Sequence, residues 1–208
     1  MARPKVFCVG ANKTGTTSMQ HLLQMLGYAV APQGPAERML EDWARRDFSA
    51  LIKFCERHEA FQDIPFCLPF TFQAVDQAFP GSRFILTRRR DADEWFESLV
   101  RFERKALELD REVTADDLKA QNYRYPGWWW RSHVVIWGIN EDSLYDPARY
   151  KAQYERHNAS IRDYFSQRPG DLLEIEIADP EAAAKVCDFL GLPRADISMP
   201  HVNSSRAE

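Results

Sequence analysis

The most constraining feature of the sequence is a short apolar run that leads into a loop rich in glycine and threonine. Residues 6–9 are apolar, as expected of a buried strand. After the loop, apolar side chains recur at the spacing of one helix face, and Gly27 follows as a C-terminal stop. These side chains are Met19, Leu22, Leu23 and Leu26. A strand, a tight loop and a helix form the first half of an α/β nucleotide-binding unit.

The rest of the chain continues this alternation. Strand-like apolar runs cover residues 60–64, 83–87 and 172–177, and segments with helical patterns separate them. We therefore expect one three-layer α/β domain over residues 1–208, with a central parallel sheet flanked by helices. Residues 104–147 fit the alternation least well and hold most of the tryptophans, so we interpret them as an acceptor-side cap or insertion.

Charge and composition exclude several classes of protein. The net charge is only -4, with both signs interspersed, whereas a broad nucleic-acid surface needs a basic excess. The four cysteines lack metal-ligand spacing and are predicted to be buried free thiols of a reducing compartment. No signal peptide is recognisable, and no window approaches the roughly 20 apolar residues of a membrane span. We expect a cytoplasmic protein without a transmembrane segment.

Residues 10–17 keep the Gly-x4-Gly spacing of a phosphate-binding P-loop. Backbone N–H groups and the start of the helix can face an anion, and Thr16, Thr17 and Ser18 add hydroxyl donors. Thr16 stands where a nucleoside triphosphatase has its lysine, and the lysine lies earlier, at Lys13. Its ammonium would reach the ligand from the other limb of the loop, which argues against a magnesium-dependent hydrolase. A P-loop small-molecule kinase remains an alternative.

A second candidate anion site follows the strand predicted over residues 83–87. Three arginines end this strand, and Ser98 lies eight residues beyond Arg90, a little over two helical turns. An arginine fork with a serine hydroxyl suits a phosphate monoester. Two separate phosphate sites argue against ATP, whose phosphates form a single chain. The alternative is a basic strand end with a surface serine.

The run Lys13-Thr14-Gly15-Thr16-Thr17-Ser18 resembles the 5'-phosphosulfate loop of sulfotransferases that use PAPS (3'-phosphoadenosine 5'-phosphosulfate). The resemblance implies that these residues hold the 5' end of PAPS and that Lys13 stabilises the bridging oxygen. The family also has a strand ending in arginine, followed eight residues later by a serine that helps to bind the 3'-phosphate. Arg90 and Ser98 match that spacing. The implied product is adenosine 3',5'-bisphosphate.

The same resemblance implies a catalytic base. Cytosolic members place a histidine two residues before a proline at a strand end, and Asp63 has that position before Pro65 here. Carbohydrate-modifying members use a carboxylate, so we expect Asp63 to act as the base. Alternatively, Asp63 caps the turn, in which case His133 and His157 are reserve candidates.

The aromatic residues between positions 123 and 137 suit an acceptor pocket, an aromatic core or a homodimer contact. We expect sulfuryl transfer to a hydroxyl or amine of a small molecule, glycan or lipid. No metal is expected, because cationic and N–H donors already neutralise the donor. The family's basic C-terminal 3'-phosphate loop is missing, although Asn203, Ser204 and Arg206 are candidates to replace it. A catalytically silent nucleotide-binding protein therefore stays open.

Overall fold

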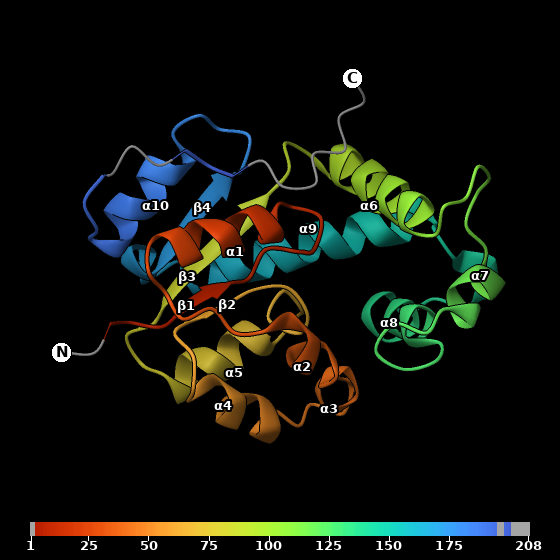
Figure 1. Cartoon of the computed structure of the whole chain (residues 1–208), viewed down its shortest axis with the longest axis horizontal. Helices are drawn as coiled ribbons and strands as arrows, with labels where there is room; N and C mark the ends of the chain where they lie inside the picture. Colours follow the sequence, from red (N-terminus) through yellow and green to blue (C-terminus); the bar gives the residue numbers. More distant parts are fainter. Residues whose placement is uncertain (1–2, 195–197, 201–208) are drawn as a thin grey trace.

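A computed structural model describes residues 3–194 and 198–200. Its core is a sheet of four parallel strands in the order β2-β1-β3-β4, which confirms the predicted parallel sheet (Figure 1). The strands are β1 (Val6–Cys8), β2 (Ala60–Phe61), β3 (Arg83–Arg88) and β4 (Leu172–Glu176). The strand predicted over residues 60–64 ends early, and Asp63, two residues on, has a left-handed backbone with a φ of 61°.

Helices connect the strands and cover both faces of the sheet, as the α/β pattern predicts (Figure 1). The amphipathic helix after the glycine loop is α1, where the sequence places it. The helices are α1 (Thr16–Met25), α2 (Gln33–Glu37), α3 (Leu40–Ala44), α4 (Ser49–Cys55), α5 (Thr71–Ala78), α6 (Ala92–Ala106), α7 (Ala115–Ala120), α8 (Trp128–Trp137), α9 (Pro147–Tyr164) and α10 (Ala182–Leu190).

The side chains of β1 alternate between two apolar layers, as the pleat of a strand requires. Phe7 packs with side chains of α4, α5 and α9 on one face of the sheet. Val6 and Cys8 pack with side chains of α1 and α10 on the other face. The result is the predicted three-layer arrangement. All four cysteines are buried free thiols, in agreement with the sequence.

The tryptophan-rich segment forms α8, which lies with α6 and α7 to one side of the sheet (Figure 1). Successive residues of a helix point in different directions, so the three adjacent tryptophans of α8 contact different parts of the protein. Trp128 packs against α3, Trp129 stacks on Phe102 of α6, and Trp130 lies beneath Lys119 of α7. No helix in the described ranges has the length and apolar character needed to cross a membrane.

Candidate active site

The loop from residue 10 to residue 18, here called the phosphate loop, is held from outside through its carbonyl groups. Two carbonyl groups of the loop, and the one just before it, each accept a hydrogen bond from a buried or half-buried side chain of another element. The carbonyl of Val9 accepts from His157 Nε2 (2.8 Å), that of Asn12 from Trp95 Nε1 (2.9 Å) and that of Lys13 from Arg89 Nε (2.9 Å). The first-turn N–H groups of α1 have no partners within the helix. The loop therefore offers a nest of donors to an anion.

Two glycines allow the loop to pack closely against its neighbours. A Cβ at Gly10 would lie 2.1 Å from the carbonyl oxygen of Thr87, so no side chain fits there. Gly15 has a φ of 97°, and a Cβ would lie 2.4 Å from Cγ1 of Ile177. The Thr14 hydroxyl lies 2.7 Å from that of Thr87 and so ties the loop to the end of β3.

Lys13 extends from the phosphate loop and lines a neighbouring cavity. Its Nζ lies 3.0 Å from the ring centroid of Phe102, and its backbone is left-handed with a φ of 67°. Burial lowers the pKa of Lys13, while the nearby charges of Asp63 and Glu103 act in the opposite direction. The ammonium is therefore poorly solvated and close to the predicted base.

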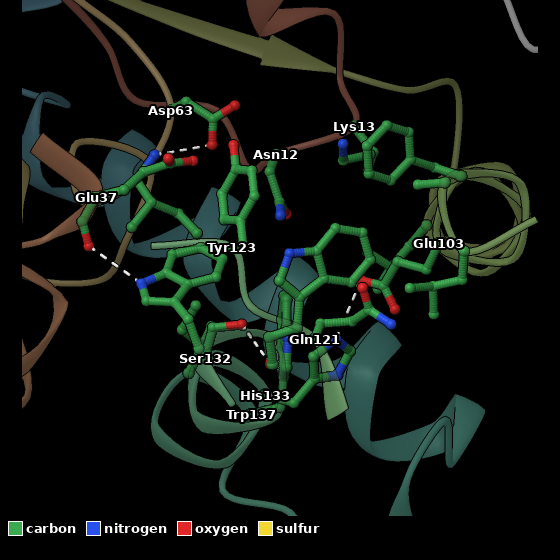
Figure 2. A pocket seen from close by; sticks show the side chains of 18 of the residues that line it. Asn12, Lys13, Glu37, Asp63, Glu103, Gln121, Tyr123, Ser132, His133 and Trp137 are labelled. Atoms are coloured by element: carbon green, nitrogen blue, oxygen red, sulfur yellow. Dashed lines mark hydrogen bonds and ion pairs between the residues drawn. The ribbon is translucent and has the colours of Figure 1, made fainter. Parts of the chain in front are cut away.

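Asp63 reaches the same cavity from the turn after β2 (Figure 2). One carboxylate oxygen accepts the N–H of the next residue, Ile64, at 2.8 Å. The other oxygen accepts the Thr16 hydroxyl at 3.2 Å. Asp63 is buried, and the structure brings it together with the predicted loop residues Lys13 and Thr16.

The three arginines at the end of β3 point in different directions. Arg90 points outward, with 75% of its side chain exposed, and pairs with Asp91 at 3.0 Å. Arg88 pairs with two carboxylates of β4, Glu174 and Glu176. Neither guanidinium meets Ser98.

Of the three arginines, Arg89 is the one whose guanidinium contacts Ser98. Its Nη2 lies 3.3 Å from Ser98 Oγ, while its Nε donates to the Lys13 carbonyl. Glu94 contacts the same guanidinium at 3.4 Å. Ser98 is buried on α6, so Arg89 and Ser98 form a polar group directly beside the phosphate loop.

The cavity that contains Lys13 and Asp63 has a volume of about 420 Å³. In Figure 2, Lys13 and Asp63 lie along one edge of it, and Ser132, His133 and Trp137 lie at the opposite edge. Aromatic side chains form much of the wall: Phe102, Tyr123, Trp128, Trp129 and Trp137. This arrangement places a space with largely aromatic walls beside the lysine and the carboxylate.

Glu37 is a second buried carboxylate of this cavity, and no pattern in the sequence marks it. Gln33 Nε2 donates to it at 2.8 Å, and Arg124 forms a salt bridge with it. Burial raises the pKa of Glu37, and the charge of Asp63 adds to this effect, whereas Arg124 opposes it.

Glu103 and His133 form a buried pair at the far side of the cavity. His133 Nε2 lies 3.0 Å from Glu103, and its Nδ1 lies 2.7 Å from the Tyr150 hydroxyl. Burial alone would raise the pKa of Glu103, but His133, Tyr145 and Lys13 together hold it below its ordinary value. Both ring nitrogens of His133 are occupied, which makes it a poor base.

His157 is also committed to the fold. Its Nε2 binds the Val9 carbonyl, and burial lowers its pKa to about 4. Within the described ranges, no three His, Cys, Asp or Glu side chains are grouped so as to hold a metal ion. The candidates Asn203, Ser204 and Arg206 lie outside the described residues.

Comparison with known proteins agrees with this geometry. A family model for the sulfotransferase domain matches residues 5–207, nearly the whole chain. No curated protein matches the chain significantly. The parallel sheet and its strand–loop–helix start are consistent with such a domain. The chain therefore belongs to the sulfotransferase domain family.

Proposed function

We propose that this sulfotransferase-family protein uses PAPS as its donor and transfers the sulfuryl group to a hydroxyl or amine. The observation that carries the proposal is the joint placement of Lys13, Asp63 and the Arg89–Ser98 group around one loop. One group suits each requirement of the reaction: a cation for the leaving group, a base for the acceptor, and polar donors for a second phosphate.

The residues of the phosphate loop fit the 5' end of the donor. Gly10 and Gly15 let the loop backbone pack directly against Thr87 and Ile177, which fixes its shape. Thr16 and Thr17 begin α1, whose N-terminus favours negative charge. Lys13 carries the positive charge of the loop into the cavity. These features are those of an anion cradle with its cation on the acceptor side.

The 3'-phosphate has two candidate partners among the arginines. Arg89 already contacts Ser98, and it does so through only one of its guanidinium nitrogens, Nη2. Arg90 keeps the spacing of the family pattern but is exposed beside Asp91. We propose Arg89 with Ser98 as the principal group, and Arg90 as an outer residue that contacts the phosphate from the solvent side.

Asp63 is the proposed base. The donor supplies the sulfuryl group, and the acceptor oxygen or nitrogen forms the new bond to sulfur while the bond to the 5'-phosphate oxygen breaks. The acceptor proton passes to the Asp63 carboxylate, whose Oδ2 now accepts the Thr16 hydroxyl. Lys13 neutralises the charge that develops on the 5'-phosphate oxygen.

The cavity also indicates the class of acceptor. Its aromatic walls suit a flat apolar face, and three carboxylates line it: Glu37, Asp63 and Glu103. An acidic acceptor would meet this negative charge, so we propose a neutral or cationic acceptor of modest size. The segment of α7 and α8 then serves as the acceptor-side cap.

The direct test is product formation. Purified protein is incubated with PAPS and a panel of neutral alcohols, phenols, sugars and amines, together with carboxylated analogues, and adenosine 3',5'-bisphosphate is measured. We expect release with neutral or cationic acceptors. Asp63→Asn should lower kcat by about 10²- to 10⁴-fold, because it removes the base but keeps the side-chain shape.

The matched control is Asp142→Asn, which changes an exposed carboxylate that does not line the cavity. It should leave kcat unchanged. Consumption of ATP with magnesium in place of PAPS would refute the proposal and favour a kinase. Binding of the bisphosphate without turnover for any acceptor would favour a silent nucleotide-binding protein.

A further inference from the structure

We propose that Phe102 is a positioning residue for Lys13, holding its ammonium against the ring face at the border between the donor loop and the acceptor cavity. This inference rests on the proposed function, because it assigns a task to Phe102 in the same reaction. It starts from one contact: Lys13 Nζ lies 3.0 Å from the Phe102 ring centroid. That distance is well inside the range in which a cation and an aromatic face attract each other.

The ring is the closest partner of the ammonium. Lys13 forms no salt bridge with any carboxylate in the part of the chain that the structure describes, and Asp63 and Glu103 act on it from a greater distance. A lysine side chain has four rotatable bonds, and a poorly hydrated ammonium without a carboxylate gains most from an aromatic face. Phe102 therefore limits where the charge of Lys13 can lie.

Phe102 is itself fixed by its helix. It is half-buried on α6, its ring stacks on Trp129 at 6.4 Å with an interplanar angle of 16°, and its neighbour Glu103 is anchored to His133. It also follows Ser98 by four residues, so both side chains lie on the same helix face. One helix thus presents Ser98 to the proposed 3'-phosphate and Phe102 to the lysine.

The same ring lines the acceptor cavity. An acceptor that packs on Trp129 and Phe102 therefore lies next to the ammonium that neutralises the leaving group. We infer that the phenyl face sets the distance between Lys13 and the acceptor. A side chain of similar volume without a ring would fill the space but leave Lys13 free to move into solvent or toward Asp63.

Three variants separate positioning from packing. Phe102→Leu keeps much of the apolar volume but removes the ring face, and Phe102→Tyr keeps the ring face. Phe96→Leu is the matched control, because Phe96 lies on the same helix beneath another lysine, Lys151, at 5.6 Å. Binding of adenosine 3',5'-bisphosphate to each variant checks that the fold and the donor site are intact.

The first readout is structural and independent of activity. Protein labelled with ¹³C-lysine is studied by NMR, and the Lys13 signal is assigned by its loss in Lys13→Arg. Protons above an aromatic ring are shielded, so the Lys13 ε-methylene signal should lie upfield of the other lysines. The shift should persist in Phe102→Tyr and Phe96→Leu and disappear in Phe102→Leu.

The second readout is the conversion of PAPS to adenosine 3',5'-bisphosphate, with water or the best panel acceptor as the second substrate. Phe102→Leu should lower kcat by about 3- to 30-fold, the range that one cation–π contact supports, with little change in KM for PAPS. Phe102→Tyr should recover most of the loss, and Phe96→Leu should match the wild type.

The two readouts distinguish the possible failures. An unshifted Lys13 signal in the wild type would overturn the proposed contact. A shifted signal with an unchanged kcat in Phe102→Leu, or a change in KM alone, would overturn its role in catalysis. A wild-type protein that converts no PAPS would refute the proposed function, and with it the catalytic role of Phe102, even if the NMR shift is present.

Discussion

His157 is bound to the start of the phosphate loop, and its burial should make the free energy of unfolding depend on pH. Its Nε2 donates to the Val9 carbonyl, immediately before Gly10, and the side chain is 5% exposed. Burial lowers the pKa of His157 from its ordinary value of 6.5 to about 4. The unfolded chain therefore binds a proton at this residue between pH 6.5 and pH 4, whereas the folded chain does not.

This difference in protonation means that acidification should lower the free energy of unfolding. The contribution of neutral His157 to stability is complete above the pKa of the unfolded state and falls as the pH drops through the window toward 4. At 1.4 kcal/mol for each pKa unit, the folded protein should lose about 2 kcal/mol by about pH 5 from this residue alone.

The assay is urea unfolding of the wild type and His157→Gln at about pH 7.5 and about pH 5. Glutamine can donate to the same carbonyl but does not titrate, and the other acidic groups cancel in the comparison. We expect the wild type to lose about 2 kcal/mol more than the variant on acidification. Equal losses in both proteins, or an NMR titration of His157 near 6.5 in the folded state, would show that burial does not keep His157 neutral.

Three further predictions concern the loop and its neighbours. Gly10→Ala should lower the free energy of unfolding by about 1–3 kcal/mol and weaken bisphosphate binding, because the added Cβ has no room. Gly170→Ala, where a Cβ meets no neighbour, should change neither quantity. Urea unfolding measures the stability, and calorimetry measures the binding. Arg89→Gln should weaken bisphosphate binding by about tenfold or more and Arg90→Gln by less, and the reverse order in calorimetry would restore Arg90 as the principal partner. Glu103→Gln should lower stability by about 1–3 kcal/mol, because His133 loses its charged partner, and a thermal shift no larger than that of an exposed carboxylate variant would contradict this.

The phosphate loop and the sheet could be predicted because their signals are local. Glycine spacing, the lysine position and the helix face after the loop lie within a single stretch of sequence, and the structure arranges them as expected. The choice among the three arginines could not be predicted in the same way. Which guanidinium meets Ser98 depends on how β3 ends against β4, where Glu174 and Glu176 take Arg88.

The residues that line the cavity are even harder to predict from the sequence. Glu103 and His133 are 30 residues apart, and only the packing of α6 against α8 brings them together. Glu37 is buried through contacts with Arg124, which lies far along the chain. Phe102 could have been found, because it follows Ser98 by one helical turn on the same face, but only the structure places Lys13 on its ring.

Calorimetric titration shows whether the phosphate loop binds a nucleotide that carries both a 3'- and a 5'-phosphate. The wild type and Lys13→Ala are titrated with adenosine 3',5'-bisphosphate and, in parallel, with ATP and magnesium. We predict saturable binding of the bisphosphate that is weakened in Lys13→Ala and exceeds any binding of ATP. Binding of ATP with magnesium alone would contradict the sulfotransferase account and support a kinase.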